Sequence, residues 1–451
     1  MIGTNGQVII SGSVCNDKAT ECRLDEIPSC RLHHFVTLSA AGGTFCDGYA
    51  VGVIGAVMPY AVGALHAGSF GSGFLGSGTL FGILAGAVIT GPLADRIGRK
   101  PLLQAGMLLA TVFSVLQLFV TSIPQLTLLR FALGVSLAAD YVAGAVYLLE
   151  YAPLRNRGKR LSLMLVSWTV GYAVAFQLAY WFCGSGGMGW RISLALGGVP
   201  ALAVYRLRRH LPESLTWLAA RRRMQEAQAV AQRHFAGYAV ILPLAAAPTP
   251  TGGERSLKAM LWSRPVVSRM LVAFVFLTAQ IVPYFCIGTF LFEILGDLGI
   301  RSGYFLGLIY TAFLVMGALL GQAIIDRMSR RVFLVGTFGI TSGLLFVLAS
   351  GYALSLMAQV ALFSVFALAL SASCCMEYVY MAELFPVEVR TSCNGITQSA
   401  SRICTSICTL VFPVMTQAHG VETVLRLTAA LLGFGALYCL IFAPDTRHAH
   451  I

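Results

Sequence analysis

The sequence predicts an all-α membrane protein in which twelve transmembrane helices form two pseudo-symmetric bundles of six. The first reason is composition: 57% of the 451 residues are hydrophobic and only 11% are charged, whereas a soluble domain carries about 25% charged residues. So few charges cannot cover a water-exposed surface, and lipid must surround most of the chain. The other two reasons are the placement of the basic residues and an internal repeat.

Twelve apolar stretches are long enough to cross a bilayer, which takes roughly 20 helical residues. They lie near 35–63, 70–92, 101–121, 124–149, 161–183, 190–208, 269–295, 302–325, 332–350, 354–380, 393–417 and 421–443. The sixth is the weakest, because Arg206, Arg208 and Arg209 shorten it. An even number of spans puts both termini on the same side of the membrane.

Lysine and arginine occur in every second loop. They cluster at 96–100, 155–160, 206–223, 255–269 and 327–331, and the links near 61–69, 121–125, 184–189 and 350–353 contain none. Basic loops stay in the cytoplasm, so we expect an inner (plasma) membrane protein of bacterial type with both termini cytoplasmic. The same clustering argues against nucleic acid as a partner, despite a formal net charge of +12.

These positions divide the chain into five parts. We expect a mostly disordered cytoplasmic tail at 1–33, a six-helix bundle at 34–208, a cytoplasmic linker at 209–268, a second bundle at 269–443 and a short tail at 444–451. The linker begins amphipathic and then becomes rich in Pro and Gly. It is therefore expected to lie on the surface and to be helical in part.

Two charged motifs recur at nearly the same offset. The elbow at 95–100, which follows the second span, returns at 326–331 after the eighth, an offset of 231. The loop at 150–157, which follows the fourth span, returns at 383–390 with Glu, Pro and Arg at matching positions, an offset of 233. Such regular matches indicate a duplicated chain whose halves move against each other.

The first elbow, with Gly91 four residues before Asp95, resembles the Gly-x-x-x-Asp-Arg-x-Gly-Arg-Lys signature of the major facilitator superfamily. In the second copy the first glycine comes one residue too early and Ser329 replaces the inner glycine. Residues 212–218 (Pro-Glu-Ser-Leu-Thr-Trp-Leu) are similar to the Pro-Glu-Ser-Pro-Arg-Trp-Leu motif after helix six. That motif is typical of the branch with sugar porters and the aromatic acid, metabolite and phosphate proton symporters.

The loop at 382–390 matches the motif after helix ten in that branch, and the resemblance covers about 35 to 447. It implies the major facilitator fold and a transporter that works by alternating access, not an enzyme. Ion pairs at the cytoplasmic edge can hold one conformation and break in another, so charged residues there are expected to be gating residues. They are Asp95, Arg96, Arg99, Lys100, Glu150, Arg157, Asp326, Arg327, Glu383 and Arg390.

The substrate is indicated by departures from these families. Residues 45–50 resemble the Asp-Gly-Tyr-Asp opening of the aromatic acid symporters, but Ala50 replaces the second acid. Sugar porters keep their helix-one aspartate at that position, which weakens a sugar interpretation. We expect a proton-coupled symporter that imports a small organic acid or a related metabolite. The alternatives are sugar or polyol symport, phosphate symport, which the Asp140-Tyr141 pair resembles, and drug efflux.

Few ionisable side chains lie deep in a predicted span, where they are costly and usually functional. Asp47 lies roughly 18 Å from the start of the first span, and Asp140 lies roughly 15 Å before the loop acid Glu150 that follows the fourth span, at 1.5 Å per residue. Burial disfavours a carboxylate anion, so such acids can exchange a proton near neutral pH, and we expect both to couple transport to protons. Arg130, which with Gly134 fits the superfamily's proton-coupling pattern, is expected to share that role or to pair with an acid.

Nine side chains are expected to line the substrate cavity. Arg402, deep in the eleventh span, cannot lose its charge and must meet a buried acid or an anionic substrate. Glu377 in the tenth span binds substrate or is a structural acid. Gln280 repeats the position of Asp47 at the offset of 233, so specificity is expected to depend on the C-terminal half. The other candidates are Tyr49, Tyr141, Trp168, Gln177, Tyr284 and Gln398.

The expected partners are a small-molecule substrate and the lipid bilayer, and the protein is expected to be a monomer. No cofactor is expected apart from the proton as coupling ion. No metal is expected either, because Cys15, Cys22 and Cys30 fit no common zinc spacing.

Overall fold

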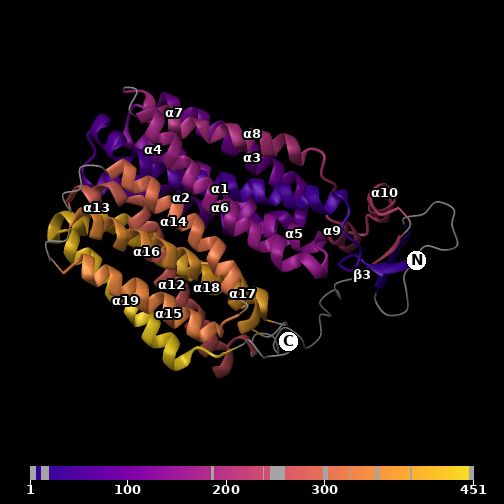
Figure 1. The fold of residues 1–451 in the computed structure, drawn as a ribbon. Coiled ribbons are helices and arrows are strands. Elements are labelled where there is room, and N and C mark those ends of the chain that lie inside the picture. The colour runs from indigo at the N-terminus through magenta and orange to yellow at the C-terminus, as the bar shows by residue number, and fades with distance from the viewer. Residues whose placement is uncertain are drawn as a thin grey trace.

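The computed structural model describes most of the chain. The described ranges are 7–11, 20–183, 187–236, 238–243, 260–297, 303–325, 327–350, 355–385 and 389–445. Almost all of these residues are helical, and the helices form two bundles that lie side by side (Figure 1). The predicted all-α architecture of two bundles is therefore confirmed, with one small sheet as an addition.

The N-terminal bundle begins with three long helices, α1 (Arg31–Ala64), α2 (Ser69–Ile97) and α3 (Arg99–Leu116). The fourth crossing runs from α4 (Ile123–Ala139) through the π-helical turn η2 (Asp140–Gly144) into α5 (Ala145–Tyr151). The fifth is α6 (Arg157–Cys183), and the sixth consists of α7 (Gly189–Leu196) and α8 (Gly198–Arg208). The π-helical turn begins at Asp140, and such turns are frequent at functional sites.

The C-terminal bundle repeats this order. It begins with α12 (Arg264–Thr289) and the short α13 (Leu291–Asp297), followed by α14 (Gly303–Ile324) and α15 (Arg330–Leu348). The fourth crossing of this half consists of α16 (Leu356–Ser373) and α17 (Met376–Leu384). The last two helices are α18 (Arg390–His419) and α19 (Val421–Phe442).

Eleven helices in the described part of the chain are long and apolar enough to cross a bilayer, one fewer than the sequence predicts. The missing one is the sixth, because α7 and α8 are separated at Gly197. Pro200 has no N–H to bond to the Leu196 carbonyl, which removes one helical hydrogen bond and weakens the helix at this point. The two short helices still follow each other along the same side of the bundle (Figure 1), and the N-terminal half keeps its sixth crossing in two pieces.

The helices α1 and α6 approach so closely that side chains are excluded where they cross. A Cβ atom at Gly48 would overlap the carbonyl of Trp168, and a Cβ atom at Gly171 would overlap the carbonyl of Phe45. Small residues allow such close backbone contacts between helices in lipid. Because Trp168 lines the cavity described below, this crossing fixes the position of one cavity wall.

We expect Gly48→Ala to destabilise the N-terminal bundle. The added methyl group must push α1 and α6 apart, and overpacking of this kind typically costs about 1–3 kcal/mol. The melting temperature of the purified protein in detergent measures the effect. Gly63→Ala is the matched control on the same helix, because a Cβ atom there meets nothing within 4 Å. Equal melting temperatures for the two variants would contradict the close crossing.

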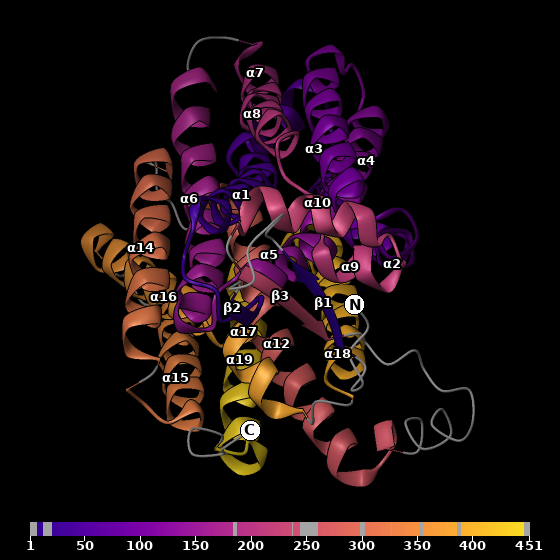
Figure 2. The same cartoon turned by 90° about the vertical axis from the view of Figure 1, so that its right-hand side faces the viewer.

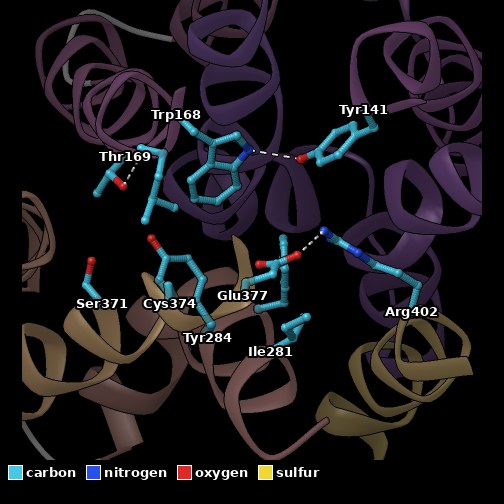
Figure 3. A pocket seen from close by; sticks show the side chains of 11 residues that line it. Tyr141, Trp168, Thr169, Ile281, Tyr284, Ser371, Cys374, Glu377 and Arg402 are labelled. Carbon is cyan, nitrogen blue, oxygen red and sulfur yellow. Dashed lines mark hydrogen bonds and ion pairs between the residues drawn. The ribbon is translucent and has the colours of Figure 1, made fainter. Parts of the chain in front are cut away.

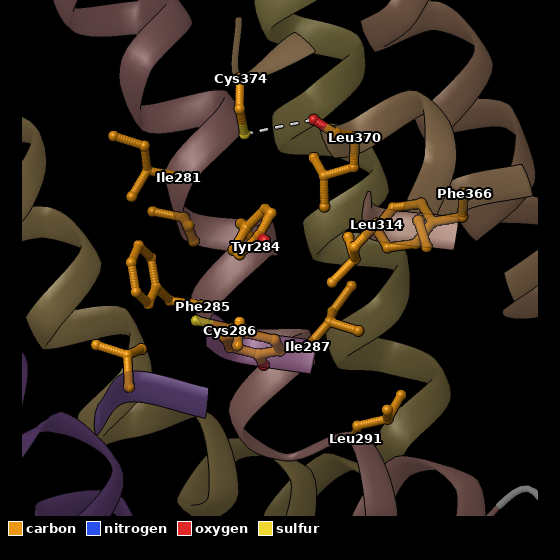
Figure 4. Close-up of a cluster of buried hydrophobic side chains, with 14 of the residues drawn as sticks. Ile281, Tyr284, Phe285, Cys286, Ile287, Leu291, Leu314, Phe366, Leu370 and Cys374 are labelled. Atoms are coloured by element: carbon orange, nitrogen blue, oxygen red, sulfur yellow. Dashed lines mark hydrogen bonds between the residues drawn. The ribbon is translucent and has the colours of Figure 1, made fainter. Parts of the chain in front are cut away.

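The helix α12 is the central helix of the C-terminal bundle, and nearly every residue from Phe276 to Thr289 is buried. Figure 4 shows part of its surroundings, which include Leu314 of α14 and Phe366 and Leu370 of α16. A helix that is apolar on all sides belongs in the interior. Its position lets α12 contribute both to this core and to the cavity between the bundles.

A small sheet joins the start of the chain to the linker. Its central strand is β3 (Tyr238–Pro243), which pairs antiparallel with β1 (Gln7–Ser11) and parallel with β2 (Thr20–Arg23). With the linker helices α9 (Leu215–Ala220) and α10 (Met224–His234), the sheet lies at the end of the N-terminal bundle that carries the basic loops (Figure 2). The expectation of a mostly disordered tail is therefore wrong for the described residues of 1–33.

Candidate functional site

A cavity lies between the two bundles and contains about 500 Å³ of space not filled by atoms, part of it open to solvent. The N-terminal half contributes side chains from η2 and α6, and the C-terminal half contributes side chains from α12, α16–α17 and α18. The lining residues are Tyr141, Leu165, Trp168, Thr169, Ile281, Tyr284, Phe285, Ser371, Cys374, Glu377 and Arg402 (Figure 3). A ligand in this cavity would therefore touch both bundles at once.

An arginine and a glutamate meet inside this cavity. One Nη atom of Arg402 lies 3.7 Å from Oε1 of Glu377, and the two side chains are only 16% and 13% exposed. This distance is longer than a hydrogen bond, so the two groups form an ion pair that is not tightly bonded. The Arg402 guanidinium also lies over aromatic rings, 5.3 Å from the ring centroid of Tyr141 and 5.6 Å from that of Phe285. The sequence left open whether Arg402 faces an acid, and the structure identifies Glu377 as that acid.

Aromatic side chains form much of the cavity wall. The indole Nε1 of Trp168 donates a hydrogen bond of 2.9 Å to the Tyr141 hydroxyl (Figure 3). The Trp168 ring stacks on Tyr172 and lies tilted against Tyr284. The Tyr284 hydroxyl is buried without a hydrogen-bond partner among the described residues. The wall therefore offers flat apolar faces together with one unused hydroxyl group.

Asp47 lies next to this cavity but does not line it. Its side chain is fully buried, and neither carboxyl oxygen has a hydrogen-bond partner among the described residues. The Asp47 carboxyl group interacts electrostatically with Asp140, Arg208 and Arg402. Tyr141, which lines the cavity, interacts electrostatically with both Asp47 and Arg402, so a change of charge at Asp47 acts on a side chain of the cavity wall.

Asp140 is held by an arginine that no sequence pattern singled out. Two nitrogen atoms of Arg208 donate to the two oxygen atoms of Asp140, one of them at 2.8 Å, and both side chains are buried. Arg208 also donates to Ser39 and to the Leu103 carbonyl. Arg130, the expected partner, instead donates to the Ala50 carbonyl at 2.5 Å. The prediction of an Arg130 partner is wrong for Asp140, because Arg208 at the end of α8 reaches the π-helical turn.

Four of the predicted cavity residues do not line the cavity. The Tyr49 hydroxyl donates to the Ser193 carbonyl at 2.7 Å inside the N-terminal bundle, and Gln177 is exposed on α6. The Gln280 amide lies buried beside Cys374, one layer behind the wall. Gln398 is half-buried on α18, one turn before Arg402. The other five predicted cavity residues, Tyr141, Trp168, Tyr284, Glu377 and Arg402, meet in the cavity (Figure 3).

The charged elbow of the N-terminal half forms a connected cluster. Arg99 pairs with Glu150, and the linker residue Glu213 accepts from the backbone N–H groups of Arg99 and Lys100 at 3.0–3.3 Å. A carboxylate at the first N–H groups of α3 is favourable, because the helix N-terminus carries partial positive charge. The linker helix α9 also reaches the elbow, since the Trp217 indole donates to the Asp95 carbonyl at 2.8 Å.

The C-terminal half repeats this arrangement at the same offsets. Arg330 pairs with Glu383, with nitrogen–oxygen distances of 3.0 and 3.2 Å, and these two residues are the counterparts of Arg99 and Glu150. The Tyr147 hydroxyl donates to the Pro212 carbonyl at 2.7 Å, and the Tyr380 hydroxyl donates to the Pro444 carbonyl at 2.8 Å. The contacts Tyr147–Pro212 and Tyr380–Pro444 are therefore also counterparts in the two halves. The repeated loops therefore fold alike.

Among the described residues, the side chains of the other predicted gating residues take no part in the ion pairs Arg99–Glu150 and Arg330–Glu383. Asp95 and Arg96 have exposed side chains, as does Arg327, and Arg157 donates to the Leu149 carbonyl at 3.0 Å. Asp326 and the side chain of Arg390 lie outside the described residues. Sequence reasoning did not single out Glu213 and Arg330, which belong to the two charged clusters. The offset of 231 from Arg99 was the signal for Arg330.

Close backbone contacts join the bundles at the end remote from the basic loops. A Cβ atom at Gly73 of α2 would overlap the Leu410 carbonyl of α18, and one at Gly55 of α1 would lie 2.6 Å from the Gly288 carbonyl of α12. Ser69 donates to Gln417 at the same end. Backbone contacts across two helix pairs therefore close this end of the interface.

Comparison with known proteins gives concordant results. A family model described as "Sugar (and other) transporter" matches residues 35–451. An inner membrane metabolite transport protein of Escherichia coli (YgcS) is 31% identical over 428 residues, which cover 94% of each chain. A niacin transporter of Acinetobacter baylyi (NiaP) is 26% identical over 435 residues, which cover 94% of this chain and 97% of the relative.

Among solved structures, a partially occluded inward-open conformation of the xylose transporter XylE from Escherichia coli superposes with a TM-score of 0.77. The sequence identity is 18%, and the match covers 94% of this chain and all of the other. At this identity the likeness shows the fold alone, which is the major facilitator fold expected from the charged elbow.

Proposed function

This chain belongs to the family of sugar (and other) transporters, within the major facilitator superfamily, and on that premise we propose that it is a proton symporter that imports a small organic acid. As a member of this family it is a multi-pass membrane protein that carries a small molecule and is not an enzyme. The proposal adds the class of substrate, the coupling ion and the direction. It also places the basic loops and both termini in the cytoplasm of a bacterial-type cell, by the positive-inside rule.

The observation that carries the substrate class is the position of Arg402. It is a permanent cation, largely buried, in a cavity to whose walls four aromatic side chains contribute. An arginine frequently binds a carboxylate through two parallel hydrogen bonds. The 3.7 Å contact between Arg402 and Glu377 lacks this geometry, and a substrate carboxylate in the cavity can supply it. The flat faces of Trp168 and Phe285 suit a ring. Niacin, named for one relative, is an aromatic acid of this kind.

Asp47 is the proposed proton carrier. Neither of its oxygen atoms has a hydrogen-bond partner among the described residues, and an unpaired buried carboxylate costs several kcal/mol, so the proposal has Asp47 protonated in this conformation. Arg208 is already bound by Asp140 and backbone groups. Arg402 is therefore the cation that can respond when Asp47 loses its proton.

This arrangement supports an order of events for symport. With Asp47 protonated, Arg402 remains in the cavity and binds the substrate carboxylate. When Asp47 ionises, its negative charge attracts Arg402 and competes with the substrate, which favours release. Proton and substrate would then be released on the same side of the membrane. The paired clusters Arg99–Glu150 and Arg330–Glu383 are proposed to hold one arrangement of the bundles between these steps.

The substrate class is tested by a thermal-shift screen of the purified protein. The compounds are aromatic acids such as benzoate and nicotinate, aliphatic acids, sugars, inorganic phosphate and cationic drugs. A ligand at 100 times its Kd stabilises a protein by about 2.7 kcal/mol, so a bound acid should raise the melting temperature clearly. Stabilisation by sugars alone, without any response to acids, would overturn the organic-acid proposal while leaving the family assignment intact.

A further inference from the structure

The side chain of Arg130 is a buried charge that forms no ion pair among the described residues. It is completely buried in the N-terminal bundle, and one Nη atom donates to the Ala50 carbonyl at 2.5 Å. Its Nε and its other Nη atom are buried without a hydrogen-bond partner among the described residues. A buried cation that lacks a partner is costly in any protein and more so in a membrane. Something must compensate this charge.

Arg130 faces a cavity of its own. The cavity lies among α1, α3, α4 and the α7–α8 crossing, and it shares no residue with the cavity around Arg402. Its lining contains Ser114 and Cys46, which have an O–H and an S–H donor, and no Asp or Glu. The remaining lining side chains are mostly aliphatic. The Ser114 and Cys46 side chains therefore offer hydrogen-bond donors to this cavity, and the one charge in its lining is the positive charge of Arg130.

The cavity is small. The space open to a water molecule is about 10 Å³, against about 50 Å³ on the same scale in the cavity around Arg402, and one water molecule needs about 10–15 Å³. This space holds one particle close to the size of water and excludes an organic acid. A monatomic halide such as chloride is somewhat larger than a water molecule, so its entry requires the surrounding side chains to move slightly apart. It matches the charge, because it accepts hydrogen bonds from every direction and compensates the guanidinium.

We propose that the N-terminal bundle binds one small inorganic anion of the size of chloride at Arg130, in the cavity among α1, α3, α4 and α7–α8. The anion accepts hydrogen bonds from the Nε and Nη atoms of Arg130, with the Ser114 hydroxyl as a further donor. It stabilises the bundle and is separate from the transported substrate. The proposal is independent of the substrate and of the coupling proton.

The first test compares melting temperatures of the full chain in sodium chloride and in sodium gluconate at equal ionic strength. Gluconate is too large for the cavity, so the wild-type protein should melt roughly 2–4 °C higher in chloride, with saturation as chloride is titrated. If the two salts give the same melting temperature, the proposal is overturned, and Arg130 is compensated by water or by a protein group.

Two variants of Ala50 identify the site without removing Arg130. Ala50 lines the cavity, so Ala50→Asp places a carboxylate beside the guanidinium and should abolish the difference between chloride and gluconate. Ala50→Asn has the same shape without the charge and should keep the difference. If both variants keep it, chloride acts elsewhere and the proposal fails. This pair remains decisive even if Arg130→Gln does not fold.

Asp47 is the alternative source of negative charge, because it lies one helical turn before Ala50 on α1. If Asp47 compensated Arg130, the wild-type protein would not respond to chloride, whereas Asp47→Asn would acquire a response. That result would overturn the anion site. Direct binding of radiolabelled chloride to the purified protein, with loss of binding in Ala50→Asp and retention in Ala50→Asn, is the result we expect.

Discussion

Asp47→Asn is expected to abolish the accumulation of substrate against its gradient in proteoliposomes while preserving exchange of substrate across the membrane. The wild-type protein, driven by an inward proton gradient of one pH unit with one proton per substrate, should concentrate its substrate roughly tenfold, since a factor of ten corresponds to about 1.4 kcal/mol. Asparagine has the size of protonated aspartic acid but cannot release a proton. The variant should therefore equilibrate its substrate and accumulate none.

The two assays are measured on the same preparation. Uptake of labelled substrate under an imposed pH gradient reports coupling, and counterflow without a gradient reports binding and alternating access. Glu226→Gln is the control, because Glu226 is an exposed acid on the linker helix α10 and should leave both assays unchanged. Full accumulation by Asp47→Asn would remove Asp47 from the coupling role.

Asp140→Asn separates the two buried acids. Asp140 makes a bidentate pair with Arg208, and removing one partner of a buried ion pair typically costs about 3–5 kcal/mol, because the other charge is left uncompensated. We therefore expect this variant to lose stability, whereas Asp47→Asn removes no hydrogen bond that the described residues contain. A stable Asp140→Asn protein that accumulates no substrate would instead give Asp140 the coupling role.

The sequence predicted the parts of the structure that repeat. The offset of 233 matched Glu150 with Glu383, and in the structure each of them pairs with an arginine, Arg99 and Arg330, whose positions differ by the elbow offset of 231. Such contacts are predictable because a duplicated fold brings duplicated positions together. The boundaries of the spans were predictable for a similar reason, since a bilayer sets one length for every crossing.

The directions of side chains around each helix were less predictable. Tyr49 and Tyr284 are both tyrosines in central helices, yet one donates to Ser193 inside the N-terminal bundle and the other faces the cavity. A helix buried on all sides has no polar face from which its orientation can be read. The five predicted residues that line the cavity include both charged ones, whose burial is costly enough to require a partner or a cavity.

Contacts between parts of the chain that are distant in sequence were not predictable at all. Arg208 was interpreted as a residue that shortens the sixth span, although it is buried and holds Asp140, 68 residues away. The strand β1 precedes the whole N-terminal bundle in the chain, and its partner β3 follows that bundle in the linker. Neither partner has a local pattern that identifies the other. The sequence alone therefore assigned too little structure to the N-terminal tail.

Arg402→Gln is expected to raise the KM for an organic acid by roughly thirtyfold or more, because the loss of a buried charge partner costs about 2–5 kcal/mol. The change also leaves the Glu377 carboxylate in the cavity without the cation that faces it, which would repel an anionic substrate. Initial rates of uptake into proteoliposomes, measured over a wide range of substrate concentration, report KM and the maximal rate separately.

The double variant Arg402→Gln with Glu377→Gln separates binding from stability. It removes both charges of the pair, so no unpaired charge remains and the melting temperature should return close to that of the wild-type protein. If Arg402 binds the substrate carboxylate, the double variant still has the high KM, because two neutral amides cannot replace a guanidinium at a carboxylate. A wild-type KM in the double variant would show that Arg402 only compensates Glu377, and the transported molecule would then need no negative charge.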